Sequence, residues 1–183
     1  MFNSLFDGAP VDIMQMLDAR ERRAHTQQQL LEQFNPCVLV SITLNIPGPV
    51  KNSEAITTVF ASVISELDEA LMPFEKLHQE DFSLQTGMEF YRVLRADALD
   101  VKRVCTEFEE GHALGRLLDI DVVEMAGETP TPISRTALGM SPRRCFICNE
   151  EAKVCARSRK HTVLEMQEHI ARLVAEYTST QRP

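Results

Sequence analysis

Hydrophobic residues at helical spacing predict four helices in this chain. Pro10 fits the first turn of the first helix, Ser53 is a suitable N-cap for the second, and Gly111 ends the third. The predicted helices cover residues 10–34, 53–72, 98–110 and 162–177.

Shorter runs rich in β-branched residues predict strands between these helices. Residues 37–46, CVLVSITLNI, lead into Pro47-Gly48-Pro49, a turn that cannot continue a strand ladder. Residues 88–94 alternate in polarity, and residues 118–122 read Leu-Asp-Ile-Asp-Val. We therefore expect three strands, at 37–46, 88–94 and 118–122.

Two segments carry weaker patterns and are expected to be irregular. Residues 74–86 are polar, and residues 127–142 read as a long loop with at most a short strand at 133–138. The order of elements predicts an α+β fold with a small mixed or antiparallel sheet and flanking helices. A length of 183 residues suits a single domain spanning 1–183.

Composition indicates which binding partners and which cellular compartment to expect. The formal net charge of −8 disfavours nonspecific binding to nucleic acid or to an anionic membrane. The N-terminus lacks the basic start and apolar stretch of a secretory signal, so a cytoplasmic protein is expected. Five cysteines then indicate reduced thiols or a metal site rather than disulfides, with Cys37 and Cys105 as small buried hydrophobes.

One segment departs from the acidic average. Residues 143–160 hold six cations against two anions, a local charge of +4. Such a segment can receive phosphates or an acidic protein, whereas the alternative is a solvated basic loop and helix start. The cations are Arg143, Arg144, Lys153, Arg157, Arg159 and Lys160.

The Leu-Asp-Ile-Asp-Val pattern is the sharpest chemical feature. A strand directs Asp119 and Asp121 to one face while the apolar residues pack on the other. Paired carboxylates are ligands for Mg²⁺, which assists in-line displacement at phosphorus. Gly115 and Arg116 just upstream favour this interpretation, because a glycine permits close approach and an arginine grips phosphate. The alternative is a half-buried strand with a solvated acidic face.

Two further segments offer candidate substrate contacts. The loop NIPGPVKNS joins a strand to a helix, and Asn45, Gly48 and Lys51 in it are candidates for holding an anion near a helix N-terminus. Arg20 and Arg23 lie three apart on the first helix and can point together into a cleft. A structural turn and a solvated helix face are the alternatives.

The basic segment also contains a Cys/His pattern at residues 145–161. Cys145-x2-Cys148-x6-Cys155-x5-His161 has the ligand chemistry of a zinc site. The spacings around Cys155 are less regular than in common zinc fingers. Free thiols that pack a small irregular subregion are therefore the alternative.

Three motifs together carry a family resemblance over essentially the whole chain. NIPGPVKNS, GHALGRLLDIDVVEM and RRCFICNEEAKVCARSRKH, with ARERR at residues 19–23, resemble the citrate lyase holo-acyl-carrier-protein synthase family. The resemblance implies transfer of phosphoribosyl-dephospho-CoA from triphosphoribosyl-dephospho-CoA to a serine of the apo acyl-carrier (gamma) subunit of citrate lyase, with release of pyrophosphate.

Applied to these residues, the implied reaction gives a mechanistic hypothesis. Asp119 and Asp121 hold Mg²⁺ on the triphosphate, Arg116 and Lys51 clamp its oxygens, and the segment near Arg157 and Arg159 meets donor or carrier. The acceptor of the serine proton stays open, with the aspartates among the candidates.

The fold that this hypothesis suggests is loosely like nucleotidyltransferases of the polymerase β type, although the usual Gly-Ser helix start before the aspartates is missing. Two other functions remain alternatives. One is a related nucleotidyltransferase acting on another carrier protein, and the other is a zinc-binding adaptor without enzymatic activity.

Overall fold

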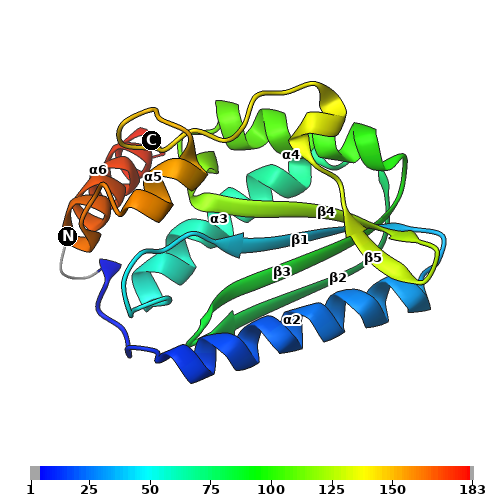
Figure 1. Cartoon of the computed structure of the whole chain (residues 1–183), viewed down its shortest axis with the longest axis horizontal. Coiled ribbons are helices and arrows are strands. Elements are labelled where there is room, and N and C mark those ends of the chain that lie inside the picture. Colours follow the sequence, from blue (N-terminus) through cyan, green and yellow to red (C-terminus); the bar gives the residue numbers. More distant parts are fainter. Residues whose placement is uncertain (1–4, 182–183) are drawn as a thin grey trace.

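The computed structural model, which describes residues 5–181, contains one five-stranded antiparallel sheet with helices on both faces (Figure 1). The strands lie in the order β2-β3-β1-β4-β5. Their bounds are β1 Val38–Leu44, β2 Glu75–Leu84, β3 Gly87–Arg95, β4 Leu118–Ala126 and β5 Thr129–Pro132. The predicted α+β class with an antiparallel sheet and flanking helices is confirmed.

The helices divide between the two faces of the sheet. Figure 1 shows α2 along one face, with α3 and α4 across the other. Asp12 caps α2 at Gln15, so this helix begins at Ile13 rather than at Pro10 as predicted. The bounds are α2 Ile13–Gln33, α3 Glu54–Ala70, α4 Ala98–Gly111, α5 Ala152–Ser158 and α6 Val163–Thr180, with 3-10 helices η1 Gly115–Leu117 and η2 Arg135–Leu138.

Strand alternation separates two cores. The larger core joins the sheet to α3, α4 and α6 and includes Ile42, Phe60 and Ile120. The smaller core joins α2 to the opposite face and includes Leu31 and Val123. Because alternate residues of a strand face opposite sides, the α2 face of β4 also carries the two aspartates at 119 and 121.

Both segments that were expected to be irregular differ from the prediction. Residues 75–84 form edge strand β2, which pairs with β3 from Glu75–Arg95 to Leu84–Gly87. Strand β2 is polar because most of it is exposed, so no apolar alternation marks it. Residues 129–132 form edge strand β5, which tolerates its prolines, and residues 135–138 are the 3-10 helix η2 rather than a strand.

Within residues 5–181, the first residues of β4 have no neighbouring strand on the side away from β1. β5 pairs only with residues 123–126, so the outward backbone groups before them need other partners. Lys102 Nζ donates to Ile120 O at 3.0 Å, and Ile120 N donates to Glu109 Oε1 at 3.2 Å. Arg143 donates to Leu118 O. Side chains from α4 and from the loop that contains Arg143 therefore satisfy these backbone groups and fix this part of the strand.

Candidate active site and metal centre

The acidic pair lies on β4 where α2 leaves the sheet partly uncovered. In the ladder with β1, Asp119 lies opposite Thr43 and Asp121 opposite Ser41. The side chain of Asp119 is 58% exposed. The surrounding protein raises the pKa of the Asp121 carboxyl, and the negative charge of Asp119 raises it further. A bound cation would relieve this repulsion, so the pair fits a hard metal ion.

Arg143 contacts the carboxylate of Asp119, and Arg116 lines the same pocket as these two residues. Arg143 Nη1 donates to Asp119 Oδ1 at 3.1 Å, and Arg143 Nη2 donates to Arg116 O at 2.9 Å. The Arg116 guanidinium donates to the carbonyl of Arg144. Burial lowers the pKa of Arg116, as do the positive charges of Arg143 and then Arg135. Arg116 therefore has cationic neighbours, a setting that an anionic ligand would stabilise.

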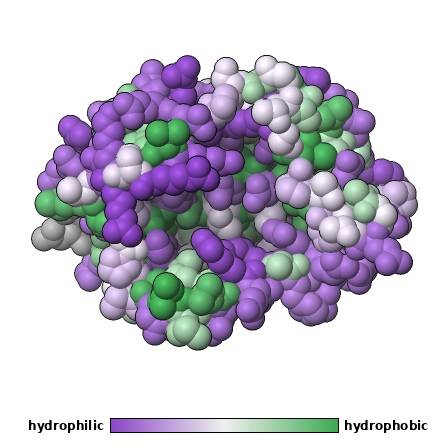
Figure 2. Space-filling model, viewed as in Figure 1, coloured by the Kyte–Doolittle hydropathy of each residue, from purple (hydrophilic) through white to green (hydrophobic). Residues whose placement is uncertain are grey.

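A pocket of about 850 Å³ lies beside these groups, within the size range of small-molecule sites. Figure 2 shows this face of the molecule hollowed between the N-terminal part of α2 and the α5 region. The lining combines cations with apolar side chains, and Asp119 is the one carboxylate that residues 5–181 contribute to it. Its cations are Arg116, Arg143, Arg144, Lys153 and Arg159, and its larger apolar residues are Pro47, Phe146, Val163 and Met166.

The pocket brings together residues from three sequence motifs. Asn45 from the NIPGPVKNS loop, Arg116 and Asp119 from the β4 motif, and Arg159 from the basic segment all line it. In the sequence, Arg143 was noted as one of six cations and as the first residue of the motif RRCFICNEEAKVCARSRKH. Neither observation predicted its direct bond to Asp119.

Other predicted substrate contacts have visible structural partners. Lys51 Nζ donates to Ile46 O at 2.7 Å, and burial lowers the pKa of this lysine. Gly48 has a φ of +91°, and Gln167 of α6 donates to the preceding Pro47 O at 3.1 Å. Lys51 therefore braces the NIPGPVKNS loop, and Gln167 fixes it against α6.

Gly115 has a packing reason to be glycine. A Cβ at this position would lie 2.5 Å from Phe108 O, because η1 packs directly on α4.

Three predicted arginine contacts lie elsewhere: Arg23 donates to the buried Glu89 at 3.1 Å, while Arg20 and Arg157 are exposed. Substrate contacts for these residues stay predictions.

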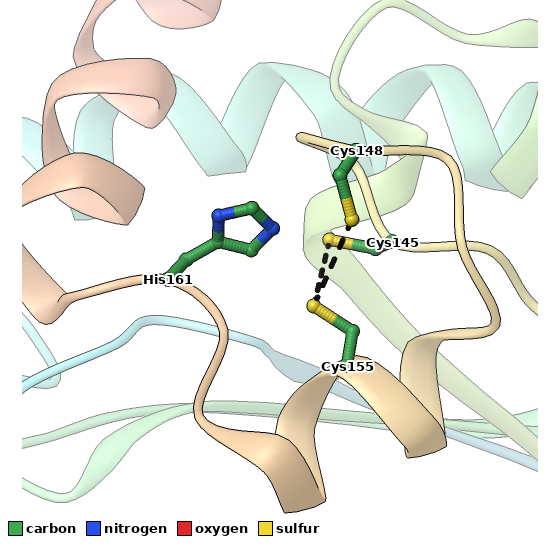
Figure 3. A group of neighbouring side chains, drawn as sticks. All are labelled: Cys145, Cys148, Cys155 and His161. Atoms are coloured by element: carbon green, nitrogen blue, oxygen red, sulfur yellow. Dashed lines mark hydrogen bonds between the residues drawn. The ribbon is translucent and has the colours of Figure 1, made fainter.

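The Cys/His pattern converges into one cluster (Figure 3). The ligand atoms of Cys145, Cys148, Cys155 and His161 all lie within 4.8 Å of one another. The sulfur of Cys155 lies 3.5 Å from that of Cys145 and 3.9 Å from that of Cys148. Tetrahedral zinc, with Zn–S bonds of about 2.3 Å, places its sulfurs about 3.8 Å apart.

Electrostatics in the cluster also suit a metal. Burial raises the pKa of Cys145, but hydrogen bonds from the backbone N–H groups of Cys148 and Ile147 and from the side chains of Cys155 and Cys148 together lower it, so the net shift is downward. The backbone N–H of Glu150 lowers the pKa of Cys148, followed by His161. The His161 Nε2 is buried without a hydrogen-bond partner among the described residues. Burial, followed by the hydrogen bonds with Cys145 and Cys148, raises the pKa of Cys155 to about 12. The cluster therefore offers a metal ion two cysteines with lowered pKa values and a free imidazole nitrogen, and a bound metal would have to deprotonate Cys155.

A carboxylate pair beside a basic pocket has the chemistry required by a transferase that acts on phosphate groups. Residues 11–177 match the family described as apo-citrate lyase phosphoribosyl-dephospho-CoA transferase. The chain belongs to this family. Among residues 5–181, no helix is both long enough and apolar enough to cross a membrane.

Individual relatives agree with the family match. A protein of Streptococcus pyogenes named probable apo-citrate lyase phosphoribosyl-dephospho-CoA transferase is 41% identical over 94% of this chain and 90% of its own length. A Shigella boydii protein with that name, without "probable", is 35% identical over 85% of this chain and 84% of its own. A longer Leuconostoc mesenteroides protein named CitXG is 35% identical over 91% of this chain but only 36% of its own length.

Proposed function

We propose that this protein transfers phosphoribosyl-dephospho-CoA from triphosphoribosyl-dephospho-CoA to a serine of the apo acyl-carrier subunit of citrate lyase. Family membership over residues 11–177 supports the transfer and the acceptor complex. The observation that supports the site is the lining of one pocket by Asp119 together with Arg116, Arg143 and Arg159. An adaptor without enzymatic activity finds no support in the family match.

In the proposed reaction, the serine oxygen forms a bond to the phosphorus next to the ribose, and the bond from that phosphorus to pyrophosphate breaks. The serine proton leaves to a carboxylate or to the departing pyrophosphate. Asp119 and Asp121 hold Mg²⁺, which when bound neutralises charge on the phosphate oxygens. Arg116 and Arg159 bind the phosphates from the pocket wall, and its apolar residues contact the uncharged part of the donor.

The direct test is mass spectrometry of the apo acyl-carrier subunit after incubation with protein, donor and Mg²⁺. A mass gain equal to the donor minus pyrophosphate is expected. Omitting Mg²⁺ should abolish the gain, and adding Mg²⁺ but not Zn²⁺ should restore it, because the two metals occupy different sites. Absence of a gain with verified substrates would contradict the proposed function.

We further propose that the Cys/His cluster binds one structural zinc ion. When bound, zinc links the 145–148 turn, helix α5 and the residue before the α6 cap, all of which border the pocket. Elemental analysis should give one zinc per chain. Cys148→Ser should lower this content severely, whereas Cys37→Ser, outside the cluster, should keep it. Equal zinc in both variants would refute the assignment.

A further inference from the structure

Arg143 occupies the place where the acidic pair meets the pocket. Besides Asp119, its guanidinium contacts the carbonyls of Arg116 and Leu118, and its Nη2 lies 3.9 Å from the buried Glu109 carboxylate. The side chain is 23% exposed. One end of the guanidinium is thus fixed to backbone and the other end rests on a solvent-facing carboxylate.

The backbone that carries Arg143 is also fixed. Ala152 N donates to Arg143 O at 2.8 Å, and Cys145 N donates to Glu150 O at 2.6 Å. These bonds connect the arginine to the fold of the Cys/His cluster. A movement of the Arg143 terminus therefore requires rotation of side-chain torsions only.

Arg143 and a metal ion would compete for Asp119. A cation held by Asp119 would lie close to the Arg143 guanidinium, and like charges at short range repel, twice as strongly for a divalent ion as for a monovalent one. The competition disappears when a triphosphate enters, because its oxygens attract both the arginine and the metal.

We propose that Arg143 Nη1 donates its hydrogen bond to Asp119 in the absence of ligands. When metal and donor bind together, the side chain rotates and Nη1 donates to a phosphate oxygen of the donor instead. The inference rests on the proposed function, because it needs Asp119 as a metal ligand. It assigns to Arg143 a role in binding a phosphate of the donor. Because Arg143 leaves Asp119 only when the donor is present, the metal binds tightly only together with the donor.

A purely structural role is the competing explanation, since Arg143 also satisfies Leu118 O at the edge of β4. The two roles differ in what they predict for metal affinity without donor. Loss of an edge contact leaves metal affinity unchanged or weakens it. Loss of a competing charge strengthens it.

The experiment measures Mn²⁺ binding by electron paramagnetic resonance to the full chain, first without donor. Mn²⁺ replaces Mg²⁺ because both prefer oxygen ligands. Arg143→Ala should bind Mn²⁺ about tenfold more tightly than the unmodified protein, while its KM for the donor rises about tenfold. Arg103→Ala is the matched control, because it removes the same charge from an exposed pair with Asp100.

The outcomes separate the inference from the function on which it rests. If Arg143→Ala and Arg103→Ala bind Mn²⁺ equally, the inference is overturned and the metal site survives. If Asp121→Asn does not weaken Mn²⁺ binding, both the metal site and the inference fail. Should Arg143→Ala not fold, Arg143→Lys keeps the charge; it should bind Mn²⁺ like the unmodified protein and bind donor more weakly, and unchanged donor binding would overturn the inference.

Discussion

The two faces of the sheet use the same strands for different purposes. On one face, α3, α4 and α6 cover a continuous apolar core. On the other face, α2 packs only a small apolar cluster, and polar side chains occupy the remaining area. Gln27 bonds to Ser41 there, and Glu89 accepts from both Arg22 and Arg23.

This difference shows how one strand can serve stability and chemistry together. Ile120 is buried in the large core, while its neighbours Asp119 and Asp121 face the uncovered side. The apolar side fixes the backbone, and the fixed backbone holds the two carboxylates in place without using a flexible loop. Changes on the two faces should therefore separate stability from activity.

The largest expected effect is on the covered face. Phe60→Ala removes a fully buried ring from the large core and should lower the free energy of unfolding by about 3–5 kcal/mol. Phe82→Ala is the same change on the α2 face, where the ring is 40% exposed and packs edge-on against Tyr91. It should cost about 0.5–1.5 kcal/mol. Equal losses in urea unfolding would contradict the contrast between the faces.

The next effect should appear in the rate. Asp121→Asn should lower kcat by roughly 10²–10³-fold, the usual size for loss of one electrostatic stabiliser. Its thermal stability should rise at neutral pH. Although Asp121 is exposed, partial desolvation by the surrounding protein and then the charge of Asp119 raise its pKa in the folded state. The ionised carboxylate therefore disfavours folding at neutral pH and the amide does not.

The pH dependence of this gain in Tm is a separate check. Below the ordinary aspartate pKa of 3.8, the carboxyl is protonated in both the folded and unfolded states. The advantage of Asn at position 121 should therefore shrink as the pH falls towards that value. A gain that is independent of pH would show that charge at Asp121 is not its cause.

The difference between the faces also explains which strands could be predicted from the sequence. The alternation in residues 118–122 predicted both the strand and the shared direction of its aspartates, because one buried face leaves a clear pattern. Strand β2 was missed because its exposure removes that pattern, and β5 because its prolines are typical of loops. Motif resemblance identified the family, which the comparisons confirm.

The site was harder to predict than the strand. The pocket combines side chains from residue 45 to residue 166, and sequence spacing does not encode such distant neighbours. The Cys/His residues are close enough in sequence to be grouped, and the structure confirms that they converge. By contrast, the bond between Arg143 and Asp119 depends on how the loop after β5 returns to β4.

The smallest expected effect distinguishes two arginines that the sequence treats alike. Arg159 lines the pocket and Arg157 is absent from its lining. Arg159 has a φ of +49°, so asparagine is the replacement of choice because it tolerates this backbone conformation. Arg159→Asn should raise the KM for the donor by up to about fivefold and leave kcat nearly unchanged, because an exposed ionic contact contributes about 0.2–1 kcal/mol.

Arg157→Asn is the matched control, with the same loss of charge two residues earlier. The difference in KM between the two variants should narrow as salt rises, because screening weakens exposed charge pairs. If Arg157→Asn raises the KM as much as Arg159→Asn at every ionic strength, the donor responds to the overall charge of α5. The pocket wall would then not set the position of the phosphates, and the contact assigned to Arg159 would be wrong.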